Sequence, residues 1–129
     1  MFVQNSVCVK GQKSRDITSE IVKAAAESGV KEGICCVSAL SEHTGIVSIP
    51  EKRQEILEDI RDDLERILPP RTNYRDCCDP ELSAGRSRAA LLESSKDFII
   101  HEGEVLISGN VYLMPFSDTC ECSYTITCC

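Results

Sequence analysis

The chain has 129 residues, a formal net charge of −7, 42% hydrophobic residues and 27% charged residues. This length and composition predict one globular domain with a core of its own. No apolar run approaches the roughly 20 residues of a membrane helix, which argues against a membrane protein. The acidic balance argues against nucleic acid as a partner, although it leaves room for a local cationic pocket. Residues 1–5 lack a basic segment followed by an apolar core, so we expect no secretory signal and a cytoplasmic protein.

Cysteine is unusually frequent, with nine residues in all. Three adjacent pairs occur, Cys35-Cys36, Cys77-Cys78 and Cys128-Cys129, and Cys120 and Cys122 stand one residue apart. None of these spacings is the Cys-x2-Cys of zinc ribbons, and Cys120 with Cys122 suits a metal or a redox pair only weakly. We therefore predict no metal site and expect mostly reduced cysteines that pack as small hydrophobic side chains.

The first half of the chain alternates between strand and helix patterns. A partly alternating strand over residues 2–10 leads into a polar connection over residues 11–15. A helix follows over residues 16–29, capped by an Asp and ended by a Gly. Residues 33–40 are nearly all apolar, which predicts a central strand that is buried on both faces. Residues 45–49 form the next predicted strand.

The second half opens with the strongest helical pattern, over residues 51–68. Its apolar residues recur at helical spacing, Pro69-Pro70 ends it, and its acidic face is typical of a solvated surface. An irregular polar stretch and a shorter helix over residues 84–94 follow. Short strands are then predicted over residues 97–101, 104–108, 110–116 and 123–127. The patterns together predict a mixed α and β domain that spans residues 1–129.

A polar segment, residues 41–45, separates two of the predicted strands and contains His43 and Thr44. Glu51 stands where the second of these strands ends, so His43 and Glu51 lie at opposite ends of one short strand. Chemistry is often housed at such positions, but a single histidine in a turn can equally be a solvated surface residue. The other histidine, His101, precedes a glycine turn in a strand region where we expect no polar neighbour beyond Glu102.

Several segments resemble one known family in their order and spacing. They are Ile17-Thr18, Ser-Gly-Val-x-x-Gly-Ile at residues 28–34, His43-Thr44, Glu51, Asp59, Pro69, Tyr74 and residues 100–109. This set is similar to the YjbQ-like family, whose members are often labelled secondary thiamine-phosphate synthases. The resemblance implies an α+β fold, which we expect as a single compact domain with a mostly antiparallel sheet and about three helices. It also implies a homotrimer, a polar pocket lined by histidines and acidic residues, and a weak thiamine-phosphate synthase activity.

The chain also departs from the family pattern. Gly45 stands where the family has a second Thr, and Asp76 and Arg86 stand where it has histidines. The family's Gly-Thr-Trp-Gln segment reads Gly109-Asn110-Val111-Tyr112, and residues 118–129 hold no clear counterpart of its Arg-bearing motif. The resemblance therefore implies His43, Glu51 and Asp59 as catalytic candidates, and Asp59 can equally be a surface charge.

These departures change the chemistry that the pocket can support. One His with carboxylates suits a transition metal less than three imidazoles do, and no cofactor is assigned. Arg86 cannot act as a base, but its guanidinium can hold a phosphate or a carboxylate, with Thr44 and Asp76 as further ligand-binding candidates. Arg86 can equally pair with Asp76 and close the pocket.

Two functions therefore stay open. In the first, the chain is a thiamine-phosphate-synthase-like enzyme with altered or impaired catalysis, in which His43 is the acid or base and Arg86 holds an anionic substrate. In the second, it is a non-catalytic binding or structural trimer whose ancestral site has decayed. A retained metal would favour the enzyme, and a filled, salt-bridged pocket the scaffold. More apolar strands are predicted than the helices can cover, which also favours a homotrimer.

Overall fold

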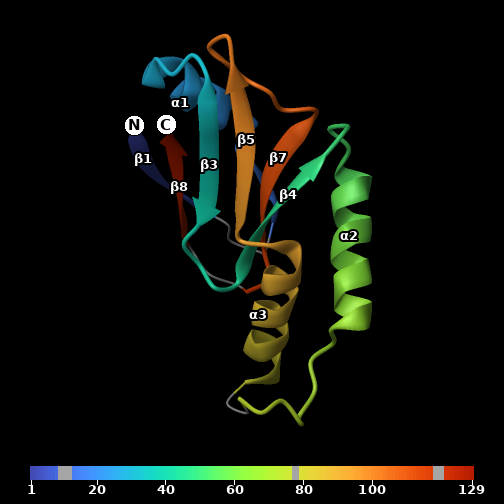
Figure 1. Ribbon diagram of the computed structural model, residues 1–129. Coiled ribbons are helices and arrows are strands. Elements are labelled where there is room, and N and C mark those ends of the chain that lie inside the picture. The colour runs from blue at the N-terminus through green and yellow to red at the C-terminus, as the bar shows by residue number, and fades with distance from the viewer. Residues whose placement is uncertain (9–12, 77–78, 118–120) are drawn as a thin grey trace.

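The computed structural model describes residues 1–8, 13–76, 79–117 and 121–129. In chain order its elements are β1 (Phe2–Val7), β2 (Arg15–Asp16), α1 (Thr18–Ser28), β3 (Gly33–Ala39), β4 (Thr44–Ile49), α2 (Gln54–Ile67), α3 (Pro80–Leu92), β5 (Ser95–His101), β6 (Glu104–Val105), β7 (Asn110–Pro115) and β8 (Cys122–Cys128). Figure 1 shows them in one compact unit, which confirms the predicted α+β domain. None of these helices is long and apolar enough to cross a membrane.

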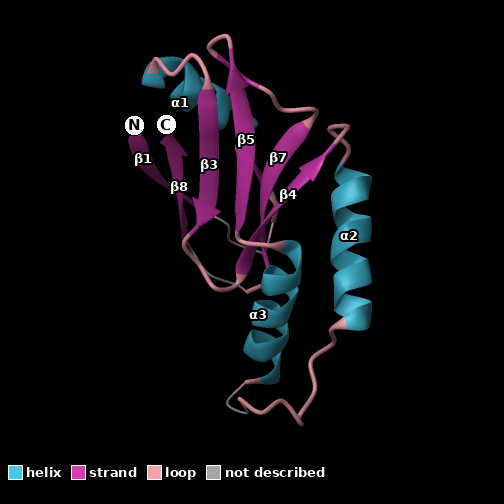
Figure 2. Ribbon diagram, viewed as in Figure 1, coloured by secondary structure: helices cyan, strands magenta, loops and turns pink. Residues whose placement is uncertain are grey.

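The strands form two sheets (Figure 2). The larger has the order β1-β8-β3-β5-β6 and the smaller the order β2-β7-β4, and the strand pairs between described residues are antiparallel. The predicted mostly antiparallel sheet is thus confirmed. Sequence analysis missed β2, which pairs with β7, because Arg15 was predicted in a polar connection and Asp16 as the cap of the following helix.

The smaller sheet lies between two hydrophobic clusters because residues of a strand alternate between its faces. Val111 and Leu113 of β7 face a core shared with α1 and the larger sheet. Tyr112 and Met114 of the same strand face a second cluster, which holds Leu57 of α2 and residues of α3. All of β7 beyond Asn110 is consequently buried. This arrangement places α2 and α3 against the smaller sheet, on the side away from α1.

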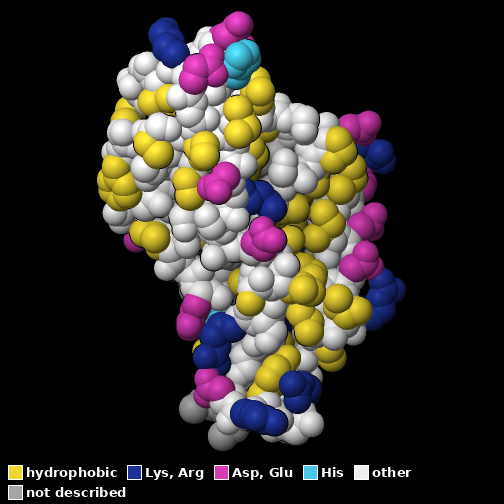
Figure 3. Space-filling model, viewed as in Figure 1, with side chains coloured by type: hydrophobic (Ala, Val, Ile, Leu, Met, Phe, Trp, Pro, Cys, Tyr) yellow, Lys and Arg dark blue, Asp and Glu magenta, His cyan; other side chains and the backbone are white. Residues whose placement is uncertain are grey.

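The prediction that residues 33–40 are buried on both faces is wrong for the isolated chain. β3 is central in its sheet, as predicted, but Ile34 is 44% exposed and the alternate residues Cys36 and Ser38 are only partly buried. Its cross-strand neighbour Ile99 is 55% exposed, and no described element covers this side of the sheet. We call this side the outer face; in Figure 3 hydrophobic side chains are scattered over it, with acidic and basic side chains among them.

Helix boundaries differ from the prediction for local reasons. α2 begins at Gln54 rather than residue 51, because Arg53 has an extended backbone and donates to the carbonyl of Glu51 at 2.9 Å. α3 begins at Pro80, four residues earlier than predicted, because Asp79 accepts the backbone N–H of Glu81 at 3.0 Å. Proline at the first helical position suits this start. The shift puts the predicted ligand residue Arg86 in the middle of α3 rather than in its first turn.

Candidate functional site

His43 lies in the turn between β3 and β4, against the middle of α3. Its backbone N–H donates to Oγ of Ser41 at 3.2 Å, and its carbonyl accepts the N–H of Phe116 at 2.7 Å. The side chain is 14% exposed, and its Nε2 has no hydrogen-bond partner among the described residues. The nearest carboxylate to this nitrogen is Glu42, at 3.7 Å. The imidazole is therefore held by its backbone, with one ring nitrogen available for a proton or a ligand.

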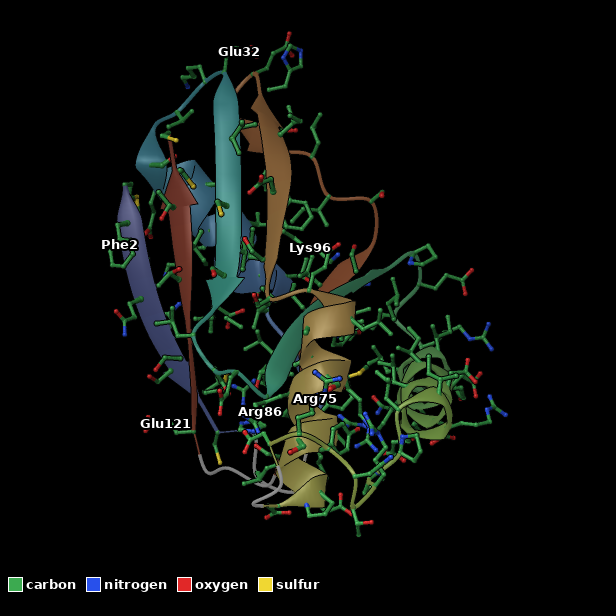
Figure 4. All side chains as sticks on the ribbon, turned by 60° about the horizontal axis from the view of Figure 1, so that its bottom comes forward. Phe2, Glu32, Arg75, Arg86, Lys96 and Glu121 are labelled. Atoms are coloured by element: carbon green, nitrogen blue, oxygen red, sulfur yellow. The ribbon has the colours of Figure 1, made fainter. Side chains whose placement is uncertain are left out.

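Arg86 and Asp76 lie together at the side of α3. Nη2 of Arg86 is 2.6 Å from a carboxylate oxygen of Asp76 and 3.3 Å from Oγ of Ser83. Ser83 in turn donates to the backbone carbonyl of Asp76 at 2.9 Å, which ties the chain before α3 to the helix. Arg86 projects from α3 on the side of the β3–β4 turn (Figure 4). The predicted pairing of Arg86 with Asp76 is thus observed.

A groove of about 470 Å³ runs between α3 and the segment that joins β3 to β4. We call it the α3 groove; its walls include Leu40, Ser41, Glu42, Thr44, Arg86 and Ala89. Thr44 is only 1% exposed, so it forms part of the floor. His43 is not among the lining residues, since its ring turns toward Gly85 on the other side of the turn. The structure thus gathers Thr44, Arg86 and Asp76 at the groove, with His43 behind one wall.

The other two catalytic candidates lie away from this groove in the single chain. Glu51 follows the far end of β4, is exposed, and pairs with Arg53 at 3.6 Å. Because a strand of six residues spans about 20 Å, Glu51 and His43 do not converge. Asp59 is exposed on α2, among the solvated acidic residues of that helix.

Two arginines near this site, one buried and one half-buried, were missed by sequence analysis. Arg88 is 5% exposed, and its Nε donates to the carbonyl of Leu68 at 3.0 Å. Arg61 donates to the carbonyl of Pro115 at 2.7 Å and lies over the ring of Phe116. Burial lowers the pKa of Arg61, and the charge of Arg88 adds to this effect. These contacts tie α2 and α3 to the end of β7 and to each other. Arg88 shares a face of α3 with the small residues Ala84 and Ala89. This pattern in the sequence could have predicted that Arg88 is buried.

Cysteine and histidine positions bear on the remaining predictions. Within the described ranges, no three His, Cys, Asp or Glu side chains come together as metal ligands. The six cysteines of those ranges are free, whereas Cys77, Cys78 and Cys120 lie outside them.

The expectation that His101 has no polar neighbour beyond Glu102 is wrong, because its Nδ1 lies 2.7 Å from the carboxylate of Glu32.

Comparison with known proteins adds the following similarities. A family model described as "UPF0047 protein YjbQ-like" matches residues 5–124. No curated protein sequence matches the chain significantly. A YbjQ-like protein of unknown function from Sulfolobus solfataricus P2 has a similar structure, with a TM-score of 0.88, 22% identity, and coverage of 98% of this chain and 94% of that chain.

Two further solved structures share the fold. An uncharacterised conserved protein of the YjbQ/UPF0047 family from Clostridium acetobutylicum has a TM-score of 0.87 and 22% identity, with coverage of 98% of this chain and 99% of that chain. A hypothetical protein from Aeropyrum pernix K1 has a TM-score of 0.85 and 11% identity, with coverage of 100% of this chain and 98% of that chain. At these identities the likeness concerns the fold.

Proposed function

The chain belongs to the YjbQ-like family, and from that premise we propose that it binds a small phosphate-like anion in the α3 groove, with altered or impaired catalysis. The observation that carries this proposal is the guanidinium of Arg86 at the wall of a groove of about 470 Å³. Hydroxyl groups of Ser41 and Thr44 belong to the same groove and can donate to an anion. A guanidinium makes strong charge-assisted hydrogen bonds to phosphate oxygens.

The surrounding charges predict weak binding. Asp76 already holds Arg86 at 2.6 Å, so an anion must displace this carboxylate or share the guanidinium with it. Glu42 lies in the opposite wall of the groove and is exposed, which adds a second competing negative charge. The ligand is therefore a small anion that binds through Arg86. Its affinity depends on whether the carboxylate of Asp76 stays paired with the guanidinium.

Any surviving reaction is of the thiamine-phosphate-synthase-like class that the family label implies, with His43 as the acid or base. Its buried Nε2, which has no partner among the described residues, supports this role. Glu51 and Asp59 would join the site only if another copy of the chain brought its own residues to the groove, and we assign them no step. We also propose a reducing, cytoplasmic setting, in keeping with the free cysteines of the described ranges.

We further propose that the chain assembles as a homotrimer through the outer face. Ile34 and Ile99 oppose each other there, and Leu106, whose N–H donates to the carbonyl of Ile99, is 54% exposed. Exposed apolar side chains that lie together mark surfaces where proteins associate. The proposed number of three subunits is taken from the resemblance to the family.

A non-catalytic scaffold is the second candidate, and the Arg86–Asp76 ion pair favours it. Together with the Ser83 contacts, this pair satisfies the guanidinium with the chain's own side chains, as expected if the ancestral site has decayed. In this case the groove binds no anion, and His43 contributes to packing rather than to chemistry.

Calorimetric titration with inorganic phosphate separates the two functions. Wild type should bind phosphate, Arg86→Ala should weaken binding more than His43→Ala does, and both variants should keep the wild-type circular dichroism spectrum. Arg53→Ala is the matched control, because it removes one arginine at the far end of β4. If wild type binds no phosphate and His43→Ala lowers the melting temperature by several degrees, the scaffold is correct and the anion site is not.

A further inference from the structure

Two adjacent cysteine pairs, far apart in sequence, meet in the larger sheet. Cys35 and Cys36 belong to β3, and Cys128 and Cys129 form the end of β8 and the residue after it. In the antiparallel register, Cys35 lies directly opposite Cys128. The next pair, Ile34 and Cys129, exchanges both backbone hydrogen bonds, at 3.0 and 3.1 Å. Because such pairs alternate along a ladder, Cys35 and Cys128 form a non-hydrogen-bonded pair, the type in which side chains are closest.

This geometry suits a disulfide. Residues of a non-hydrogen-bonded pair have Cα atoms about 4.5 Å apart, inside the range of roughly 4.4–6.8 Å that disulfides span. Both side chains point into the core, where Cys35 is 0% and Cys128 is 2% exposed. Burial, together with a hydrogen bond between the two thiol groups, raises the pKa of Cys35 to about 12. The two cysteines are therefore free, buried and directly opposite each other.

We propose that Cys35 and Cys128 are a modification site that forms a reversible cross-strand disulfide by exchange with a small-molecule disulfide of the glutathione class. One cysteine loses its proton to solvent and attacks a sulfur of the small disulfide, which releases one small thiolate. The second cysteine, deprotonated in turn, attacks the sulfur of the first and releases the other small thiolate. The two cysteines thus lose two protons and two electrons, and the small disulfide is reduced to two thiols.

Access of a small disulfide to the two thiols depends on the end of β8. A small disulfide reaches Cys128 only when this end separates from its neighbours, because both thiols are buried in the closed sheet. The end is held by the two bonds between Ile34 and Cys129 and by two bonds of 2.9 Å between Met1 and Cys128. Local opening of a few hydrogen bonds at a strand end costs less than global unfolding, so exchange proceeds from the folded protein.

The other two thiols of the cluster are placed differently. Cys36 lies opposite Thr127 and Cys129 opposite Ile34, so they are diagonal neighbours on the outer face. Diagonal residues have Cα atoms about 7–8 Å apart, too far to bridge without backbone movement. Cys36 instead lies 3.6 Å from the hydroxyl of Ser95. The register therefore selects Cys35 and Cys128 as the bonded pair and leaves Cys36 and Cys129 as accessible competitors for the reagent.

The test uses the full chain with Cys36→Ala and Cys129→Ala, which removes these competitors, alongside wild type. Each folded protein is incubated with oxidised glutathione, denatured and alkylated without reduction, then reduced and labelled with a second alkylating reagent. Tandem mass spectrometry locates both labels residue by residue. The expected result is the second label on Cys35 and Cys128 in both proteins, a disulfide-linked pair of peptides containing Cys35 and Cys128 in an unreduced digest of the double variant, and recovery of both thiols with dithiothreitol.

Adding Cys128→Ala to the double variant should leave Cys35 with the first label and abolish the linked peptide pair. The proposal is overturned if Cys35 and Cys128 carry the first label after oxidation, or if they carry only glutathione adducts. It is equally overturned if the wild-type disulfide joins Cys36 to Cys129. These readouts follow thiol chemistry alone and are independent of phosphate binding at the α3 groove.

Discussion

The backbone of Gly85 meets the backbone of Phe116 so closely that a Cβ atom at Gly85 would lie 2.7 Å from the carbonyl oxygen of Phe116. The same Cβ atom would lie 3.4 Å from Cδ2 of His43, whose carbonyl accepts the N–H of Phe116. Helix α3, the end of β7 and the β3–β4 turn thus converge on one glycine. A side chain at this position would push α3 away from the turn that forms the wall of the α3 groove.

Replacing Gly85 with alanine tests this contact. Alanine in a helix interior is normally more favourable than glycine by about 1 kcal/mol. We expect the opposite sign here, because the atom in the way is a backbone oxygen that cannot rotate aside. Thermal unfolding should show a lower melting temperature for Gly85→Ala. The variant Ala90→Gly, at an exposed position of the same helix, measures the propensity effect alone; a higher melting temperature for Gly85→Ala would disprove the contact.

Removing the charge of Asp76 should strengthen the proposed anion site. Asp76→Asn keeps the shape of the side chain but ends its competition for the guanidinium of Arg86. An exposed ion pair contributes up to about 1 kcal/mol, so phosphate affinity should rise by up to about fivefold. Calorimetry measures the change, and Asp63→Asn, an exposed aspartate that pairs with Arg66 on α2, controls for net charge. Equal gains in both variants would point to a general charge effect rather than to Arg86.

The outer face predicts the state of assembly. Sedimentation at micromolar concentration should give a mass three times that of the 14.2 kDa chain. Ile99→Asp should shift the protein toward smaller species, because it buries a charge in the interface. Val22→Asp is the control, since Val22 is an exposed apolar residue on α1, away from the outer face. A monomer in wild type, or equal dissociation by both variants, would rule out this interface.

The contact between Glu32 and His101 predicts a dependence of stability on pH. The hydrogen bonds from His101 and from the backbone of Glu102 lower the pKa of Glu32 below its ordinary value of 4.5. A carboxyl group with a lowered folded-state pKa stabilises the fold above its unfolded pKa, and this contribution is lost as pH falls through the folded value. As the pH decreases below about 4.5, the melting temperature should therefore decrease less steeply in Glu32→Gln than in wild type. Glu104→Gln, an exposed neighbour, should retain the wild-type slope; identical slopes in all three proteins would contradict the linkage.

The elements with strong local periodicity were predicted well, and the features set by distant residues were not. The apolar repeat over α2 predicts that helix to within a few residues, and alternation predicts β8. The two residues of β2 carry no periodic signal of their own, since they form a strand only because β7 lies beside them. The apolar run at β3 indicates a central strand, but composition cannot tell whether its second face meets a helix, another subunit or solvent.

In the candidate site too, features set by nearby residues were predicted and those set by distant residues were not. The residue types at positions 76 and 86 were sufficient to predict that Arg86 can pair with Asp76, because opposite charges close in sequence around a helix start often meet. The partner of His101 was missed because Glu32 lies 69 positions away along the chain. His43 was singled out from its motif, yet its contact with Gly85 depends on how α3 packs against the turn.

The position of β8 between β1 and β3 determines when the larger sheet can assemble during protein synthesis. Phe2 pairs with Thr127, so β1 is synthesised long before its partner strand β8 emerges from the ribosome. Until then β1 has no neighbour, and one edge of β3 is unpaired. Pairing of such distant segments is slow, and open strand edges promote aggregation while they persist. The dependence of the nascent chain on chaperones is therefore greatest in the interval before β8 emerges and pairs with β1 and β3.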